Sequence, residues 1–214
     1  MAFIGMRHPV VARMNAHTDG QEPTYTGGMV IGHAITGNLS ITRNNNPLFG
    51  DDVVIEDDNG ITAMSLDMGV DDVPEDVQVY GMGLKERKSG DVTEYVDTDR
   101  SAPNVGIGYI RIRRKDNETT YQGIWMYKCV VSQESEESKT KGQSIEWNTT
   151  TLKARAAAIT VDDSGDRDFR KKANFKTEAQ AIAWLHKLAD IKDEDMSTKA
   201  DGGQVEAVAE IKTK

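Results

Sequence analysis

The chain is poor in cysteine and in aromatic residues. Cys129 is the single cysteine among 214 residues, and phenylalanine, tyrosine and tryptophan together make up 6% of the chain. One cysteine excludes a disulfide bond within the chain, which is typical of proteins made in a reducing cytoplasm. The small number of aromatic side chains argues against the aromatic platforms expected of a carbohydrate-binding module.

Long apolar runs are also missing. No segment is apolar over the length needed to cross a bilayer, and residues 1–17 lack the apolar block and cleavage site of a signal peptide. We therefore expect a protein made in the cytoplasm, with no membrane partner. The apolar content of 37% is low for a globular chain, which indicates polar extensions or a surface that an assembly covers.

Lysine and arginine are absent from residues 44–84, although this segment is rich in carboxylates. The ten acids are Asp51, Asp52, Glu56, Asp57, Asp58, Asp67, Asp71, Asp72, Glu75 and Asp76. They contribute -10 to a formal net charge of -9, so the rest of the chain sums to +1. Such a segment repels nucleic-acid phosphates, which makes tight DNA or RNA binding an unexpected role. It can serve solubility, meet a cation or meet a partner.

Alternating apolar and polar residues predict a mainly β chain. Residues 29–43 place Ile31, His33, Ile35, Leu39 and Ile41 on one face, which indicates a long half-buried strand or a bent pair with its bend at Gly37. In the 61–68 strand, Met64, Leu66 and Met68 share a face. Further strands are expected at 9–15, 92–96, 105–113, 119–131, 143–149 and 151–161. Strands at this spacing predict an antiparallel β-sandwich or barrel.

A single amphipathic helix is predicted over residues 177–191. Thr177 is the expected N-cap, and Gln180 completes a capping box. The helix packs on the sheet through an apolar stripe in which Ile182, Leu185 and Leu188 are the central residues. We expect one domain over residues 1–191, with a short helical turn at 74–80, followed by a polar tail over 192–214.

The longest stretch without a predicted strand is 44–60, which we interpret as a functional loop. It carries an apolar pair between a proline and a glycine, and this pair either folds back on its own domain or docks on another subunit. The candidate contact residues of this loop are Asn45, Asn46, Pro47, Leu48, Phe49, Asp51 and Asp52.

The sequence carries no convincing catalytic, cofactor or metal signature. The four histidines lack metal-site spacing, and His33 is interpreted as a core or interface residue. Gly106 and Gly108 lack the third glycine of a dinucleotide loop and are interpreted as close-packed strand positions. An acid–base carboxylate pair would need a burial that turn segments do not provide. Arg111 and Arg113 alternate on one strand, where they can meet a neighbour's acidic loop.

Three blocks of the chain resemble the major tail proteins, or tail-tube proteins, of long-tailed, non-contractile bacteriophages. These blocks are GMRHPVVARM at 5–14, the segment from GGMVIGHAITGNLSITR to DDVPEDV at 27–77, and YKCVVSQESEESKTKGQSIEWNTTTLKA at 127–154. The resemblance covers about two-thirds of the chain. It is weaker in the helix and the tail after about residue 174, so the role of the tail stays open.

The resemblance implies a virion protein that forms stacked hexameric rings, with double-stranded DNA passing through the lumen. Its implied partners are further copies of the chain and other tail proteins, such as the tape measure and the tail terminator. The 42–60 loop is then expected to reach an adjacent subunit or ring. The acids expected either to line the lumen or to form the interface are Glu56, Asp57, Asp58, Asp71 and Asp72. The alternative is a ligand- or carbohydrate-binding β-sandwich of a host-recognition apparatus.

Overall fold

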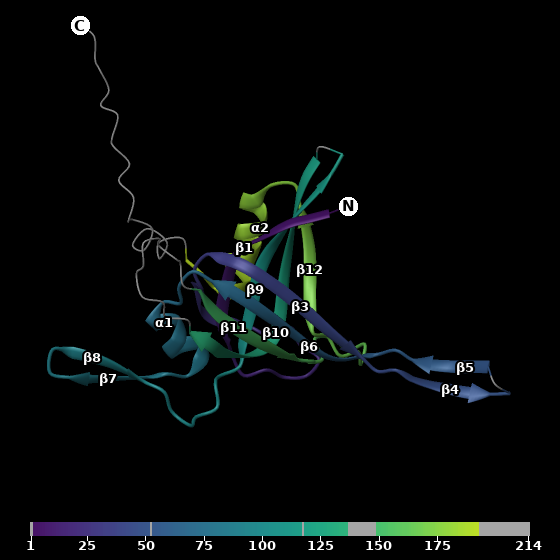
Figure 1. Ribbon diagram of the computed structural model, residues 1–214, viewed down its shortest axis with the longest axis horizontal. Helices are drawn as coiled ribbons and strands as arrows, with labels where there is room; N and C mark the ends of the chain where they lie inside the picture. Colours follow the sequence, from purple (N-terminus) through teal and green to yellow (C-terminus); the bar gives the residue numbers. More distant parts are fainter. Residues whose placement is uncertain (1, 52, 117, 137–148, 193–214) are drawn as a thin grey trace, which may run out of the picture.

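The computed structural model describes residues 2–51, 53–116, 118–136 and 149–192. It is mainly β, as predicted, with one large antiparallel sheet, two hairpins that project from it and a C-terminal helix (Figure 1). The elements of the large sheet are β1 (Ala2–Met14), β2 (Tyr25–Val30), β3 (Ala34–Arg43), β6 (Ile61–Val70), β9 (Val105–Lys115), β10 (Glu118–Glu136), β11 (Thr150–Ala157) and β12 (Arg170–Phe175). The others are β4 (Asn46–Gly50), β5 (Val53–Asp58), β7 (Lys85–Ser89), β8 (Val92–Val96), α1 (Glu75–Val77), the π-helical turn η1 (Gln78–Met82) and α2 (Glu178–Ala189).

The large sheet consists of two halves that share β10, the longest strand with 19 residues. The first part of β10 pairs with β9 on one side and β12 on the other, whereas the second part pairs with β11. The order β2-β1-β9-β10-β12 defines the first half-sheet, and β10-β11-β6-β3 defines the second half-sheet. The register shift between Met126 and Cys129 falls at the point where β10 passes from one half to the other.

The main core lies between the two half-sheets. Ile107 and Ile124 come from the first half-sheet, and Met64, Leu66 and Met68 come from the second, all at 3% exposure or less. The predicted apolar face of the 61–68 strand is therefore confirmed. Because alternate residues of a strand point to opposite faces, the other face of the second half-sheet is left open to solvent.

Helix α2 covers the outer face of the first half-sheet. Its N-cap is Thr177, as predicted, and the Thr177 Oγ1 accepts a hydrogen bond from the Gln180 backbone N at 3.3 Å. Leu185 is fully buried, while Ile182 and Leu188 are half-buried against the same cluster. The helix lies within the predicted range of 177–191. It ends at Ala189 because Asp190 adopts a left-handed conformation.

Two glycines of β9 leave room for large side chains on the outer face of the first half-sheet, Trp125 of β10 in both cases and Leu185 of α2 at Gly108. A Cβ at Gly106 would lie 2.4 Å from Cζ2 of Trp125, and one at Gly108 would lie 2.6 Å from Cδ2 of Leu185. The interpretation of these residues as close-packed strand positions is confirmed. Gly83 follows the turn η1 and ends it with a φ of 88°, a conformation that favours glycine.

The prediction that residues 44–60 form a loop is wrong, because β4 and β5 pair there as an antiparallel hairpin. Val53, Val54 and Ile55 favour a strand by their β-branched side chains, and Asp51 takes the left-handed conformation of the turn with a φ of 49°. The hairpin points away from the body of the protein (Figure 1).

The strand prediction for residues 29–43 needs correction, and two further strands were not predicted. The 29–43 segment is a bent pair, but the chain breaks at residues 31–33, where Gly32 has a φ of 123°, and not at Gly37. Strands β7 and β12 were not predicted, because charged residues dominate KERKS and the first half of RKKANF. Pairing with β8 and with β10 decides their conformation. The strand predicted at 143–149 falls outside the described residues, apart from residue 149.

Replacing Leu185 with Asp is expected to destabilise the fold by several kcal/mol, because it buries a charge against Gly108 and Trp125. The matched control is Ala183→Asp, which changes an exposed position of the same helix. Thermal unfolding followed by circular dichroism measures both variants. A melting temperature of Leu185→Asp equal to that of Ala183→Asp would show that the helix does not pack as described.

A histidine pair joins β1 to α2 and makes stability depend on pH. The Nε2 atoms of His8 and His186 lie 2.8 Å apart, and His8 has a φ of 52° beside a bulge in β1. Burial and, to a smaller extent, the charge of His186 together lower the pKa of His8 to about 4, although Glu178 opposes this shift. Glu178 in turn is paired with Arg7, with 3.2 Å between Oε1 and Nη1.

Stability is expected to fall as pH decreases from about 6.5 to about 4, because the unfolded chain binds a proton at position 8 that the folded chain resists. Urea unfolding at pH 7 and pH 5 measures this change. The variant His8→Asn, which keeps a residue type that tolerates positive φ, should show a smaller loss of stability over the same interval. An equal loss in both proteins would exclude His8 as the responsible group.

Candidate functional site

The candidate site consists of surfaces suited to assembly, and the first is the β4–β5 hairpin. Its register places Asn46 opposite Asp58, Pro47 opposite Asp57, and Leu48 opposite Glu56. Two sets of residues that were predicted separately, the loop contact residues and three of the candidate acids, are therefore neighbours on one hairpin. Among the other predicted contact residues, Asn45 precedes β4, Phe49 lies in β4 and Asp51 lies in the turn, while Asp52 falls outside the described residues.

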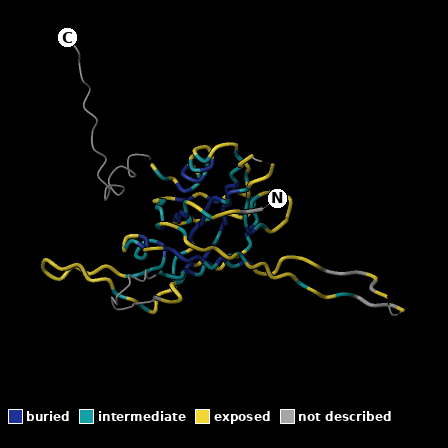
Figure 2. The backbone as a smooth tube through the Cα atoms, turned by 45° about the horizontal axis from the view of Figure 1, so that its top comes forward, coloured by how far each residue is buried: buried dark blue, intermediate teal, exposed yellow. Residues whose placement is uncertain are grey.

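Exposed apolar side chains accompany this charge. Val53 is 65% exposed and Ile55 is 67% exposed on β5. The described parts of this hairpin and of the β7–β8 hairpin, which projects from the opposite side of the body, are largely exposed (Figure 2). An exposed two-stranded hairpin buries too little surface to be held by its own packing, so a partner surface is the expected source of its order.

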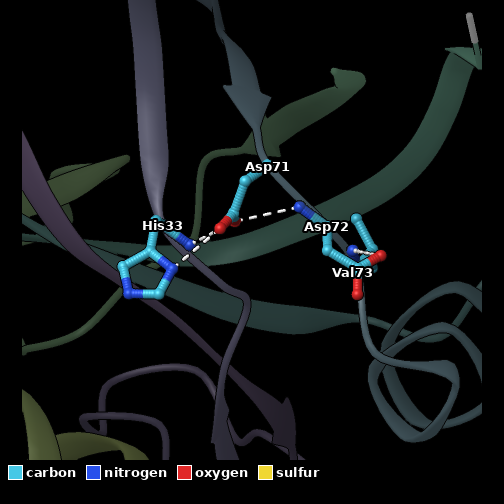
Figure 3. Close-up of polar contacts among 4 residues, drawn as sticks. All are labelled: His33, Asp71, Asp72 and Val73. Carbon is cyan, nitrogen blue, oxygen red and sulfur yellow. Dashed lines mark hydrogen bonds and ion pairs between the residues drawn. The ribbon is translucent and has the colours of Figure 1, made fainter. Parts of the chain in front are cut away.

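Asp71 and Asp72 lie at the opposite end of β6 from the hairpin, and they serve a turn (Figure 3). Asp71 Oδ1 accepts hydrogen bonds from the backbone N of His33 at 2.7 Å and of Asp72 at 2.9 Å. Asp72 Oδ1 accepts one from the Val73 backbone N at 2.8 Å. The five candidate acids are thus separated into two places, about 30 Å apart along a ten-residue strand.

His33 is placed on the surface, so its interpretation as a core residue is wrong. Its side chain is 92% exposed, and its Nδ1 lies 2.8 Å from Asp71 Oδ2. Partial burial opposes ionisation of Asp71, but the hydrogen bonds from His33 and Asp72 outweigh it and lower the pKa of Asp71. The alternation that suggested an apolar row ends at Gly32, where the chain leaves β2 and turns into β3.

The second half-sheet has two free edges. Within the described residues, β3 pairs only with β6, and the segment of β10 after residue 129 pairs only with β11. Ile35 of β3 is 54% exposed, Ile41 is 37% exposed, and Val130 of β10 is 42% exposed. A strand edge with unpaired backbone groups is a template for pairing with another strand.

The outer face of this half-sheet is polar, and two of its cations, Lys153 and Arg155, are paired. Side chains that share the face with Asn38 and Ser40 include Asp67 and Lys153, whose carboxylate and amino groups lie 3.8 Å apart. Arg155 on the same face lies 3.7 Å from Glu134. These two ion pairs reduce the uncompensated positive charge of the face.

A hollow of about 580 Å³ lies beside the free edge of β10. It is lined by residues 130–135 of that strand, by Thr150, and by residues around α1, η1 and the following segment, among them Asp72, Gln78 and Arg100. Because its wall includes the free strand edge, the hollow offers both shape and backbone hydrogen-bonding groups to an extended segment.

The described residues include neither an exposed thiol nor a metal-binding cluster. Cys129 is fully buried, and this burial raises the pKa of its thiol, so the reactive thiolate is disfavoured. Among the side chains that the structure describes, no three histidine, cysteine or carboxylate groups are placed to hold a metal ion. None of the helices in this part of the chain combines the length and apolarity needed to cross a bilayer.

Sequence reasoning missed the free edge of β10 and the basic strand β12. The edge arises because β10 is longer than β9 can cover, which depends on strand lengths and register. The run Arg170, Lys171 and Lys172 was visible in the sequence, but only pairing with β10 shows which of these residues share a face.

A comparison of the chain with protein-family models finds no matching family, and a comparison with curated proteins finds no match.

Proposed function

We propose that this protein is a structural subunit of a phage tail tube and is not an enzyme. Copies assemble into stacked hexameric rings, and double-stranded DNA passes through the lumen without tight binding. The observation that carries the proposal is the second half-sheet, which has two different free edges and an open polar face. The sequence resemblance to tail-tube proteins supports the same conclusion.

The two free edges support ring formation. If β3 of one copy pairs with the free edge of β10 in the next, the two surfaces in contact are different, so the interface is heterologous. A heterologous interface repeated by rotation closes into a ring, in which the half-sheets join into one continuous barrel. Backbone hydrogen bonds then satisfy both edges, and the exposed side chains Ile35 and Val130 become buried.

The polar face supports DNA transport. In such a barrel the outer face of each half-sheet lines the lumen, with Asn38, Ser40 and Ser65 among its small polar residues. The pairing of Lys153 with Asp67 and of Arg155 with Glu134 reduces the positive charge that could hold a phosphate. DNA binding strength depends on uncompensated cations, so this face lets DNA slide.

The projecting hairpin supports stacking. It extends beyond the body of the protein, as a contact with an adjacent ring requires (Figure 1). At the two ends of the tube the same surfaces would meet other tail proteins, with the tape measure and the tail terminator as the expected partners. The protein would accordingly be located in the virion tail.

The direct test is negative-stain electron microscopy of the purified protein over a series of concentrations and salt conditions. Hollow rings or striated tubes are expected. Discrete particles under every condition would contradict self-assembly by this chain alone and would favour a ligand- or carbohydrate-binding module, which a glycan-binding screen would then examine.

Replacing Ile35 with Lys is expected to prevent ring formation while the subunit stays folded, because a lysine on an edge strand disfavours pairing with another strand. Val92→Lys is the matched control, since Val92 is 61% exposed and lies on the β7–β8 hairpin. Electron microscopy counts the rings, and circular dichroism monitors the fold. Equal assembly of the two variants would show that the β3 edge is not the ring interface.

Replacing Leu48 and Phe49 together with Ser is expected to shorten the polymers and to leave the monomer folded, because the loss removes apolar contact area from the hairpin. The control changes Val92 and Tyr95 of the other hairpin, which are 61% and 43% exposed, to Ser. Polymer lengths from electron micrographs measure the effect. Lengths equal to those of the unmodified protein would exclude a stacking role for the apolar pair.

A further inference from the structure

A strip of four cations lies on the inner face of the first half-sheet, beyond the main core. Arg111 and Arg113 come from β9, and Arg170 and Lys172 come from β12. The register places Arg111 opposite Gln122 and Gln122 opposite Asn174, while Lys172 is opposite Ile124. Since residues two apart share a face of a strand, all four side chains lie on the side that carries Ile124 and Tyr109.

The strip is electrostatically unfavourable as it stands. Burial lowers the pKa of Lys172, and the charges of Arg170, Arg111 and Arg113 lower it further. Burial also lowers the pKa of Arg170, and the charge of Arg111 contributes, while Tyr109 opposes the shift. The Nη1 atom of Arg170 is buried and has no hydrogen-bond partner in the described part of the chain.

Few groups of the strands themselves offset this charge. Asn174 Oδ1 accepts hydrogen bonds from Arg113 Nη1 at 3.4 Å and from Gln122 Nε2 at 3.0 Å. On this face of β9, β10 and β12, within the described residues, Glu118 is the one carboxylate, and it lies at the far end of the strip opposite Lys115. An added acidic segment would relieve repulsion among the cations and supply an acceptor to the buried Nη1 atom of Arg170.

We propose that this strip binds the acidic β4–β5 hairpin of a second copy of the chain. The inference rests on the proposed function, because it names the contact between neighbouring subunits. Residues 46–58 of the hairpin contain five carboxylates and no lysine or arginine, so their charge is complementary to that of the strip. The strip and the hairpin match in length. The strip extends alongside residues 120–126 of β10, a distance of about 20 Å, and the strands of the hairpin are about 17–20 Å long.

The hairpin of the same copy is not the occupant. It leaves the body beyond β3 and β6 and extends away from it, whereas the strip lies on β9 and β12 within the body (Figure 1). Nucleic acid is the less favoured partner, because the chain as a whole carries a net charge of -9 and repels phosphates at a distance.

A reciprocal charge exchange tests the proposal in the full chain. One variant changes Arg170 and Lys172 to Glu, and the other changes Asp51 and Asp57 to Lys. We expect each variant alone to self-associate about tenfold more weakly than the unmodified protein, or worse, because like charges then meet in the contact. A mixture of the two should associate again, because each contact between unlike variants brings opposite charges together.

Sedimentation velocity measures self-association, and circular dichroism confirms folding. The matched control is Lys176→Glu with Lys187→Glu, which makes the same change in net charge at exposed positions near and on α2 and should assemble normally. Arg170 is half-buried, so Lys172→Glu alone, at an exposed position, serves as a milder variant whose fold is not at risk. It should weaken association in the same direction.

The outcomes separate this inference from the proposed function. Normal association of the Arg170 and Lys172 variant, or a mixture that associates no better than its components, would overturn the inference while rings and tubes of the unmodified protein still stood. Absence of rings and tubes from the unmodified protein would instead overturn the proposed function. The Arg170 and Lys172 variant can also be compared with the unmodified protein on immobilised double-stranded DNA. If the variant lost the retention of the unmodified protein but self-associated normally, the strip would be assigned to nucleic acid and the inference would be overturned.

Discussion

The structure depends on one strand that belongs to two half-sheets. β10 pairs with β9 and β12 over its first part and with β11 over its second, so the sheet folds back on itself and encloses the main core. Because β10 is longer than its partner β9 can cover, its final segment pairs within the described residues with β11 alone. The same constraint that encloses the core therefore also creates the edge on which the proposed ring is built.

Charge is distributed over the fold in a way that polymer formation would use. Acids are concentrated on a hairpin that projects from the body, cations gather in a strip on the inner face of the first half-sheet, and the open face of the second half-sheet carries paired charges. A subunit arranged in this way offers complementary surfaces at different places, which heterologous association requires. It also places the strip of Arg111, Arg113, Arg170 and Lys172 on a different half-sheet from the face that would meet DNA.

Much of the fold was predictable where local patterns and tertiary packing agree. The face shared by Met64, Leu66 and Met68 and the N-cap at Thr177 follow from periodicity and from capping chemistry, and both are found as expected. The hairpin formed by β4 and β5 was missed because its acids and asparagines indicate a loop, whereas its β-branched residues and its cross-strand pairing determine the outcome. Strand β12 was missed for the same reason, since a basic segment shows no alternation until β10 pairs with it.

The sequence by itself determined the mainly β class, the position of the C-terminal helix, the concentration of acids in residues 44–84 and the close-packed character of Gly106 and Gly108. These are properties of neighbouring residues, so periodicity and composition carry them. Only the tertiary structure decided that the acids are divided between a hairpin and a turn, that His33 is exposed, and that Arg111, Arg113, Arg170 and Lys172 form one strip. The physical reason is that strand pairing and register bring together residues far apart in the chain, and local propensities do not encode which strands will pair.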